Sequence, residues 1–394
     1  MCAGCHNSIG RLENDSMSKR KVAIRKSSQA EAAARSATLA QSRITIDRVD
    51  REIVKLLNER AKIARQIGEL KRAEGHPLYD PLRERQLLDR VSESSKGPLD
   101  DRSVRAVFRE LISGSRALVT PVRVAYLGPP YSYSHLAAIE RFGQSAELVP
   151  VATIAAVFED VNRGQTNFGL VPIENSTDGR VVDTLDMLAR LPVRICGEVQ
   201  LRIHHNLLGK CTRAEVQEVY SKPQALSQCR NWLAKHLPSA HVVEMTSTAA
   251  AAKLAAEKPG AAAIASRQAA VNYGLDVIAP DIQDNKDNIT RFAVTGDQEA
   301  PRTGNDKTSV VFQIEHRSGA LAEAMAIFKR NRLNLTWIES FPIAHTGTDS
   351  EYLFFVEMEG HQKDAKIKRA VDSLGRKAVR LEILGSYART DPID

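Results

Sequence analysis

A single arginine interrupts an otherwise apolar heptad seam, and this seam constrains the fold of the N-terminal third of the chain. Its spacing alternates between three and four residues, the pattern of one helix face that packs against another helix. A guanidinium in such a core needs a partner, because an isolated buried charge is very unfavourable. That partner is either an acidic neighbour or an anionic ligand inside a helical bundle. The seam consists of Ile46, Val49, Ile53, Leu56, Arg60, Ile63, Ile67 and Leu70.

Two further cations favour the ligand. Lys71 lies about 16 Å beyond Arg60 along a helix and nearly in phase with it. Arg43 lies about 26 Å before Arg60, too far for both to hold one small molecule within a single helix. An antiparallel second copy would bring its own Arg43 to the site. Helices expected over 43–73, 81–95 and 101–118 have no globular core of their own, so we predict an intertwined helical dimer with shared cationic pockets.

This segment resembles the all-helical chorismate mutase family, which has a long helix with spaced Arg, Arg and Lys, then an Asp-x-x-Arg-Glu element and a third helix. The resemblance implies an all-α domain over 41–119 that rearranges chorismate to prephenate. Such a rearrangement needs no nucleophile; it needs a compact conformer and positive charge at the ether oxygen. The implied catalytic positions are Arg43, Arg60, Lys71, Asp80, Arg83, Glu84 and Ser115.

One position departs from the family pattern. By our alignment Val119 stands where the family usually has a Gln that hydrogen-bonds the ether oxygen. Loss of such a donor can cost about two orders of magnitude in rate. We therefore expect weak mutase activity, and the alternative is a helical module that serves only dimerisation.

From Val122 onward, short aliphatic runs alternate with amphipathic helical stretches. This order predicts an α/β domain with mainly parallel strands, arranged as two small lobes joined by hinge strands around a ligand cleft. Polar loops over 128–134, 171–179, 221–228 and 287–292 follow or precede strands and are candidates to line that cleft. The predicted strands cover 122–127, 148–151, 168–172, 193–200, 216–220, 241–244, 261–265, 277–279 and 292–295.

The triplets Glu174-Asn175-Ser176 and Thr290-Arg291-Phe292 complete a resemblance to prephenate dehydratase over 121–297. The resemblance implies a two-lobed fold like that of periplasmic binding proteins, and conversion of prephenate to phenylpyruvate by loss of water and carbon dioxide. Thr290 would be the main catalytic residue, positioning or polarising the leaving hydroxyl, because its own hydroxyl is too weakly acidic to supply the proton alone. Other implied active-site residues are Asn175, Ser176, Ser221 and Gln228. Weaker candidates for substrate contact are Ser132, Ser134, Glu174, Arg291 and Phe292.

Two details of this segment stay open. Arg291 could hold a substrate carboxylate or form a structural ion pair, and we favour the ligand slightly. Tyr131 stands where the family's first loop commonly has Gly, a residue that serves a positive φ or a close backbone approach. A bulky side chain there puts the local geometry in question.

After a polar linker, the order of elements over 307–387 reads βαββαβ, a four-stranded sheet with two helices on one face. This α+β module resembles ACT regulatory domains of the type that binds phenylalanine at a dimer interface. The family usually has Arg where Phe341 stands, and Gly319 could equally be a plain strand-to-helix turn. The implied effector residues are Gly319, Ala320, Leu321, Glu339, Ser340, Phe341 and Pro342.

Composition narrows the remaining possibilities. The chain has 394 residues and a net charge of +7, much of it in a basic segment over 1–40 that we expect to be a disordered tail. Cys2-Ala3-Gly4-Cys5-His6 matches a haem-attachment motif, but no apolar export signal follows it, and Met17 is an alternative start. The adjacent His204 and His205 are expected to serve packing and hydrogen bonding. Neither a metal nor a cofactor is expected, since no dinucleotide-type Gly loop is present and the remaining cysteines, Cys196, Cys211 and Cys229, lack metal spacing.

The sequence thus predicts a cytoplasmic bifunctional enzyme of phenylalanine biosynthesis, inhibited by phenylalanine, that assembles as a homodimer or higher homo-oligomer. No apolar run reaches the length of a membrane helix, and no nucleic-acid or membrane partner is expected. One alternative is a monofunctional prephenate dehydratase with a degenerate helical module. Another is a non-catalytic amino-acid sensor built from a two-lobed cleft and an ACT module.

Overall fold

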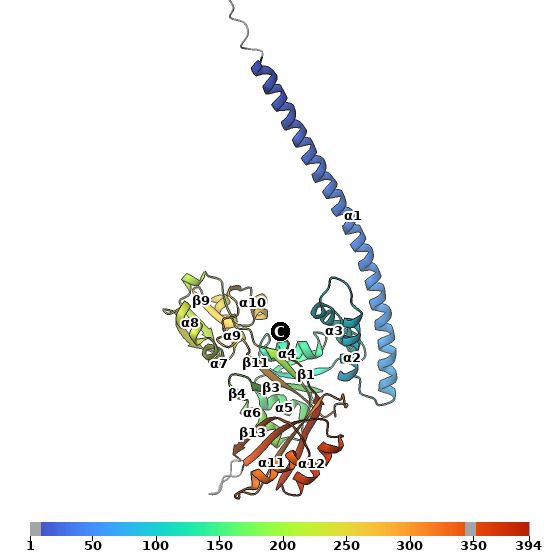
Figure 1. Cartoon of the computed structure of the whole chain (residues 1–394), viewed down its shortest axis with the longest axis vertical. Helices are drawn as coiled ribbons and strands as arrows, with labels where there is room; N and C mark the ends of the chain where they lie inside the picture. Colours follow the sequence, from blue (N-terminus) through green and yellow to red (C-terminus); the bar gives the residue numbers. More distant parts are fainter. Residues whose placement is uncertain (1–8, 343–351, 394) are drawn as a thin grey trace, which may run out of the picture. The chain divides into compact units, whose positions relative to one another are not determined.

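The computed structural model describes residues 9–342 and 352–393, with side chains from residue 38 onward (Figure 1). The chain divides into two compact units, 1–67 and 68–394, which are described separately below. The motif at 2–6 lies outside the described residues. Among those described, no helix combines the length and apolarity needed to cross a membrane.

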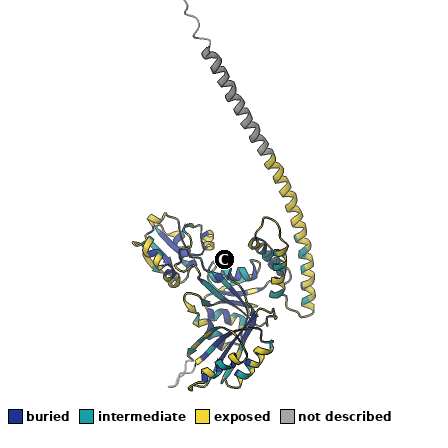
Figure 2. Ribbon diagram, in the orientation of Figure 1, coloured by how far each residue is buried: buried dark blue, intermediate teal, exposed yellow. Residues whose placement is uncertain are grey.

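The first unit is built on α1 (Ile9–Ala73), which continues into the second unit. Helical backbone already begins at Ile9, so the expectation of a disordered tail over 1–40 is wrong for most of that segment. The reason is its content of Ala, Lys, Arg, Glu and Gln, all strong helix formers, with no proline before Pro77. The predicted seam lies exposed along this helix, with Ile46 at 58% and Ile63 at 52% exposure (Figure 2).

A helical hairpin opens the second unit. Asp80 caps α2 (Pro81–Ser94) and Asp100 caps α3 (Asp101–Ala117), each accepting a backbone N–H through its side chain. The helices therefore begin and end close to the predicted bounds. Buried Arg116 of α3 pairs with Glu84 of α2 and donates to the Phe142 carbonyl at 2.6 Å, which ties the hairpin to the α/β domain.

The first lobe of the α/β domain is a mixed sheet in the order β2-β1-β3-β11-β5, with the short β4 paired to β3. Apolar side chains on both faces pack against helices, as the near-continuous apolar runs of β1 and β3 require. Its strands are β1 (Arg123–Leu127), β2 (Glu147–Val151), β3 (Phe168–Asn175), β4 (Gly179–Arg180), β5 (Arg194–Arg202) and β11 (Ile289–Gly296). Its helices are α4 (Tyr133–Phe142), α5 (Ile154–Asn162) and α6 (Val182–Arg190).

The second lobe is a five-stranded sheet in the order β10-β6-β9-β7-β8. Its central strand and α9 are rich in alanine, and these small side chains are buried against one another. The strands are β6 (Asn206–Gly209), β7 (Glu218–Ser221), β8 (His241–Glu244), β9 (Ala261–Ala265) and β10 (Asp276–Ala279). The helices are η1 (Arg213–Glu215), α7 (Pro223–Gln228), α8 (Arg230–His236), α9 (Thr248–Glu257) and α10 (Arg267–Tyr273).

The prediction of mainly parallel strands is wrong, because both sheets are mixed. Parallel pairs join β1 to β2 and β3, and β7 to β8 and β9. By contrast, β11 runs antiparallel to both of its neighbours, β3 and β5. The chain leaves the first lobe after β5 and returns through β11, so these two strands are the predicted hinge and run in opposite directions.

The C-terminal module has the predicted βαββαβ order and forms an antiparallel sheet, β13-β14-β12-β15. One face packs on the two helices through Val310 and Phe312, while the alternate face, with Val311 and Phe355, joins the core of the first lobe. The elements are β12 (Asp306–Gln313), α11 (Ala320–Arg330), β13 (Leu335–Pro342), β14 (Tyr352–Glu359), α12 (Ala365–Gly375) and β15 (Arg380–Ala388).

Candidate active sites

The two lobes enclose a cleft of about 610 Å³. Strand ends of the first lobe supply Asn175 and Thr290, and the second lobe supplies Lys222 and Gln228. Three of the predicted active-site residues, Asn175, Gln228 and Thr290, therefore line one cavity although they are far apart in the sequence. Tyr133, Thr153, Asp178, Arg180, His205 and Thr248 also line it.

Asn175 is held in one orientation and directs its amide at Thr290. Its Oδ1 accepts the backbone N–H groups of Thr177 and Asp178 at 2.9 and 3.0 Å. This fixes which end of the amide is the oxygen, so Nδ2 is the end that donates to Thr290 Oγ1 at 2.9 Å. Since Thr290 Oγ1 already accepts this hydrogen bond, its own proton is available to a group in the cleft.

Gln228 joins the second lobe to this pair. Its Oε1 accepts from Asn288 Nδ2 at 2.7 Å, and Asn288 Oδ1 in turn accepts from Asn175 Nδ2 at 2.9 Å. Its Nε2 donates to Asp178 Oδ2 at 2.7 Å. A continuous set of hydrogen bonds thus links Thr290 to the second lobe. Asn288 and Asp178 belong to this set, although the sequence pointed only to the loops that contain them.

A buried histidine completes this set. His205 Nε2 lies 2.9 Å from Gln228 Oε1, and its Nδ1 lies 3.3 Å from the Tyr133 hydroxyl. Burial lowers the pKa of His205 to about 4, although the hydrogen bond to Gln228 opposes this shift. His205 is therefore neutral at neutral pH and serves hydrogen bonding, as predicted for the His204–His205 pair. Burial also raises the pKa of Tyr133, which stays protonated.

Two cations line the cleft and can attract an anionic ligand. Lys222 is exposed at the entrance to α7, and Arg180 of β4 pairs with Glu339 of the C-terminal module at 2.6 Å. The sequence placed Lys222 only within a polar loop and gave no signal for Arg180. Asp178 and Asp183 also line the cavity, so any attraction for an anion is local to Lys222 and Arg180.

Several other predicted residues have structural roles. Ser132 caps α4, Ser134 is buried in its first turn, and Ser221 is fully buried with its hydroxyl donating to the Ile264 carbonyl at 2.6 Å. Ser176 links two loops by donating to the Asp287 carbonyl and accepting from the N–H of Ile289. None of these four lines the described cleft.

Phe292 and Arg291 correct our weaker assignments. Phe292 is 1% exposed in the apolar core of the first lobe, so it is not a substrate contact. The Arg291 guanidinium binds three protein carboxylates, those of Glu174, Glu198 and Glu357. Arg291 therefore forms a structural ion pair, the second of the two alternatives, and Glu174 is one of its partners. Both side chains point away from the cleft, because side chains alternate between the two faces along a strand.

Tyr131 adopts the backbone conformation that the glycine of the family pattern suggested, with φ at 66°. Its N–H donates to His135 Nδ1 at 3.0 Å, and its ring makes edge contacts with His135 and with Tyr273 of the second lobe. The chain thus tolerates a positive φ at a bulky residue by packing its ring.

The predicted mutase residues divide between the two units. Arg43 and Arg60 belong to 1–67, where a shallow cavity of about 400 Å³ is lined by Arg60, Glu59 and apolar seam residues. Burial lowers the pKa of Arg60. The remaining predicted residues belong to 68–394, namely Lys71, Asp80, Arg83, Glu84 and Ser115.

Within 68–394 these residues are engaged locally. Asp80 Oδ1 accepts the Arg83 N–H at 3.0 Å as the cap of α2, and Lys71 Nζ lies 3.4 Å from the Pro77 carbonyl. Glu84 pairs with Arg116, and burial nevertheless raises its pKa. Ser115 donates to the Leu111 carbonyl at 2.6 Å. Val119 packs against Gly68 of α1, and Gly68 lies three residues before Lys71 in the sequence.

The predicted effector residues lie at two places in the C-terminal module. Gly319 has φ at 82° at the start of α11, followed by buried Ala320 and exposed Leu321. Glu339, Ser340, Phe341 and Pro342 end the edge strand β13. Phe341 stacks on Phe355 at 5.4 Å and packs against the core shared with the first lobe.

The fold and the cleft define a class of protein, a two-lobed α/β enzyme domain joined to a helical module. Residues 124–300 match the prephenate dehydratase family and residues 42–120 match chorismate mutase type II. The chain is 41% identical over 356 residues to the bifunctional chorismate mutase/prephenate dehydratase of Aquifex aeolicus, an alignment that covers 89% of this chain and 98% of that protein. The chain belongs to the bifunctional chorismate mutase/prephenate dehydratase family, which confirms that it is an enzyme with both kinds of domain.

Two solved structures each match about two thirds of the chain. The prephenate dehydratase of Arthrobacter aurescens in complex with L-Phe has a TM-score of 0.64 and 34% identity, covering 68% of this chain and 90% of that one. GqqA, described as a novel type of quorum quenching acylase, has a TM-score of 0.61 and 28% identity, covering 68% of this chain and 98% of that one. Since this architecture is also found in a protein named for other chemistry, the function must be argued from the site.

Proposed function

We propose that this chain converts chorismate to prephenate and prephenate to phenylpyruvate, and that phenylalanine inhibits the second step. The observation that carries the proposal is the hydrogen bond from Asn175 to Thr290 inside the interlobe cleft. It leaves the Thr290 hydroxyl proton available to a ligand in a cavity of about 610 Å³, a size suited to a small ring-bearing dianion.

In the dehydratase step, the hydroxyl of prephenate departs while a ring carboxylate leaves as carbon dioxide. Thr290 donates a hydrogen bond to the departing oxygen, where negative charge develops. Asn175 fixes this donor before substrate arrives, so little reorganisation is needed at the moment of reaction. Lys222 is the cation best placed to attract a substrate carboxylate. Aromatisation of the ring supplies the driving force. The oxygen leaves as hydroxide, stabilised by the hydrogen bond from Thr290, and takes its proton from water.

In the mutase step, we propose that two copies of the chain share each site. The seam of α1 is apolar and exposed, and Arg43 and Arg60 are about 26 Å apart on one helix. A second antiparallel copy covers the seam and brings its Arg43 to the Arg60 of the first. This assembly is a homodimer or a larger homo-oligomer of dimers.

A rival assignment makes the helical module a dimerisation element without activity. Val119 motivates it, because an apolar side chain replaces a hydrogen-bond donor. Comparing mutase turnover of the natural protein and Val119→Gln decides between them. We expect Val119→Gln to be about tenfold faster or more. A natural rate already in the range of ordinary chorismate mutases would remove the rival.

The C-terminal module is proposed to be an ACT-type regulatory domain. Its βαββαβ order, its edge strand β13 and a glycine turn at Gly319 suit phenylalanine binding between two copies. The dehydratase of Arthrobacter aurescens, which this chain resembles, was crystallised with L-Phe. Inhibition requires that phenylalanine bind the active and inactive forms of the enzyme unequally.

One assay tests these activities together. The purified protein is incubated with chorismate, without added metal or cofactor, and prephenate and phenylpyruvate are followed with and without phenylalanine. Phenylpyruvate formation that phenylalanine suppresses is the expected result. Conversion of added prephenate but not of chorismate would assign the helical module to assembly. Conversion of neither would leave the amino-acid sensor as the function.

We also place the enzyme in the cytoplasm. The described cysteines Cys196, Cys211 and Cys229 are free thiols, and two of them are buried, a pattern usual in reducing compartments.

A further inference from the structure

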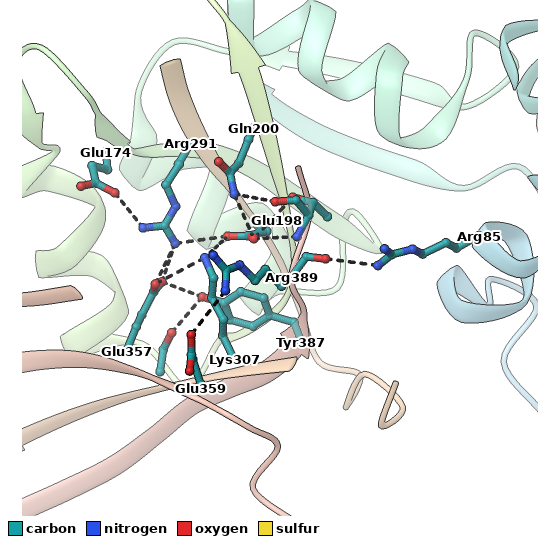
Figure 3. A network of polar contacts seen from close by, with 12 residues as sticks. Arg85, Glu174, Glu198, Gln200, Arg291, Lys307, Glu357, Glu359, Tyr387 and Arg389 are labelled. Carbon is teal, nitrogen blue, oxygen red and sulfur yellow. Dashed lines mark hydrogen bonds and ion pairs between the residues drawn. The ribbon is translucent and has the colours of Figure 1, made fainter. Parts of the chain in front are cut away.

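Five charged side chains gather between the first lobe and the C-terminal module (Figure 3). The first lobe supplies Arg291, Glu174 and Glu198, and the C-terminal module supplies Lys307 and Glu357. Four are almost out of contact with solvent, with side-chain exposures of 13% for Arg291, 7% for Lys307, 2% for Glu198 and 1% for Glu357. We call these five residues the interdomain ion cluster.

Arg291 is the centre of this cluster. Its Nη1 donates to Glu174 at 2.7 Å, and its Nη2 donates to both oxygens of Glu357 at 2.6 and 2.9 Å. Glu198 is held between the two cations, 3.2 Å from Arg291 Nη2 and 3.0 Å from Lys307 Nζ. Burial opposes ionisation of the Glu198 carboxyl, yet Lys307 and Arg291 keep its pKa below its ordinary value. The Arg291 guanidinium therefore binds protein carboxylates on both sides of the interface.

The register of β3 and β11 places this cluster directly behind Asn175 and Thr290. In the pairing of β3 with β11, Asn175 lies opposite Thr290, and the next pair is Glu174 opposite Arg291. Side chains alternate along a strand, so the first pair faces the cleft and the second faces the C-terminal module. The register shifts between Arg291 and Phe292, immediately after these two pairs. A bulge re-aims nearby side chains, so the direction of Thr290 depends on how this irregular pairing is held.

The C-terminal side of the cluster is equally well fixed. Glu357 Oε1 also accepts from the Tyr387 hydroxyl at 2.8 Å, and that hydroxyl lies 2.9 Å from Ser309 Oγ. Strands β12, β14 and β15 each contribute a residue to these contacts. A displacement of the central strands of this sheet therefore moves the carboxylate that binds Arg291.

We propose that Arg291 is a positioning residue for dehydration, which holds the ends of β3 and β11 through Glu174 and makes the direction of Thr290 dependent on the C-terminal module through Glu357. This inference rests on the proposed dehydratase role of Thr290. It deepens that role by naming the contacts through which the C-terminal module acts on the cleft. Misplacement of a catalytic group by about 1 Å can lower a rate about a hundredfold, so a small change at this interface has a measurable effect.

The test replaces Glu357 by Gln, a change of similar size that lies outside the cleft. We expect Glu357→Gln to lower the dehydratase kcat about tenfold with little change in KM for prephenate. The mutase rate is expected to stay unchanged. Phenylalanine is expected to bind, as measured by calorimetry, but to inhibit the remaining dehydration much less than in the natural protein.

Arg380→Gln is the matched control. Arg380 Nη2 donates to the Ala189 carbonyl at 2.5 Å, a contact between the same two domains that does not involve the interdomain ion cluster. If the loss of kcat in Glu357→Gln came only from a weaker contact between the two domains, Arg380→Gln would lower kcat by a similar factor. We expect its kcat and its phenylalanine response to remain within a factor of two of the natural values.

Two further variants keep the test decisive. Arg291→Gln combined with Glu357→Gln should lower kcat by no more than the stronger single change, because both remove the same contact. Arg291→Lys keeps the charge but cannot bridge Glu174 and Glu357 in the same way, so we expect an intermediate kcat. If Glu357→Gln does not fold, Glu174→Gln removes the partly exposed end of the cluster instead and is expected to show the same loss of kcat.

An unchanged kcat together with normal inhibition in Glu357→Gln, or in Glu174→Gln where the first does not fold, would overturn the proposal. That result differs from failure of the proposed function, in which the natural protein itself would not convert prephenate.

Discussion

The interlobe cleft and the helical module reach their sites by different routes. In the cleft, Asn175, Gln228 and Thr290 come from distant parts of the sequence, yet one folded chain connects them by hydrogen bonds. In α1, the predicted site residues Arg43 and Arg60 lie on a helix whose apolar seam is exposed in the single chain. The residues of the first candidate site therefore meet within one chain, and the second site is expected to need another copy.

This difference follows from what each region can bury. The two lobes fold around sheets with cores of their own, which hold polar side chains at fixed places. An amphipathic helix that leaves its apolar face in water gains most of its stability only when a second surface covers that face.

The largest effect is expected at the hydroxyl of Thr290. Thr290→Val keeps the shape of the side chain but removes the donor to the leaving group. Loss of one such donor lowers kcat about a hundredfold to a thousandfold, so dehydration should fall by that factor while the mutase rate is unchanged. Steady-state assays with prephenate and with chorismate measure the two rates separately.

Thr295 provides a matched control on the same strand. It is fully buried and its hydroxyl has no hydrogen-bond partner among the described residues. Thr295→Val should therefore leave dehydration unchanged and leave stability equal or slightly higher. A similar loss of dehydration in both variants would contradict a specific role for Thr290.

The next effect concerns how the stability of the protein depends on pH through His205, which lines the cleft. His205 has a folded pKa of about 4, below the ordinary value of 6.5, so the fold favours its neutral form. The neutral histidine therefore contributes at most about 3 kcal/mol to the free energy of unfolding. This contribution is complete above about pH 6.5 and is lost as the pH falls toward 4. His205→Gln should flatten the free energy of unfolding over this window, which urea titrations at several pH values measure. An unchanged slope would contradict the buried neutral histidine.

A smaller effect is expected in the seam of α1. Ile53 and Val54 are similarly exposed in the single chain, at 46% and 56%, but only Ile53 lies on the seam. Ile53→Ala should weaken self-association by roughly 2 kcal/mol, since a buried isoleucine is lost from the interface. Val54→Ala should change it by less than about 0.5 kcal/mol. Equal effects in sedimentation equilibrium would show that the seam is not the interface.

The smallest effect is expected at Tyr131. Tyr131→Gly relieves a positive φ worth about 1–2 kcal/mol. It also removes ring contacts with His135 and Tyr273 worth about 0.5–1.5 kcal/mol. We expect the free energy of unfolding to change by less than about 1 kcal/mol. A larger loss in urea unfolding would mean that this contact between the lobes matters more than the backbone strain.

Much of the fold could be predicted from local patterns, because apolar runs and turn residues mark strands and helices directly. The βαββαβ order and the three helices of the mutase region are examples. Strand direction could not be predicted in this way, since β11 is placed between β3 and β5 only after the chain returns from the second lobe. The helix from Ile9 was missed because a strongly charged composition suggested disorder although its residues favour a helix.

The site was partly predictable for a related reason. Asn175, Gln228 and Thr290 carry polar groups at strand and helix ends, where clefts form. Arg291 has the same chemical attraction for a carboxylate, but its neighbour Thr290 faces the cleft and alternation turns Arg291 away. The contacts of His205 and Asp178 with Gln228 could not be predicted, because they join residues whose proximity only the folded chain creates.

Mixed dimers test most directly whether the two sites differ in this way. Arg43→Gln and Arg60→Gln chains, each inactive as a mutase, are unfolded together and refolded. If each mutase site takes Arg43 from one chain and Arg60 from the other, hybrids contain one intact site, and mutase activity should return to about a quarter of the natural value. Thr290→Val and Gln228→Leu chains treated in the same way should regain no dehydratase activity. No recovery of mutase activity in verified hybrids, or recovery of dehydration, would contradict the account.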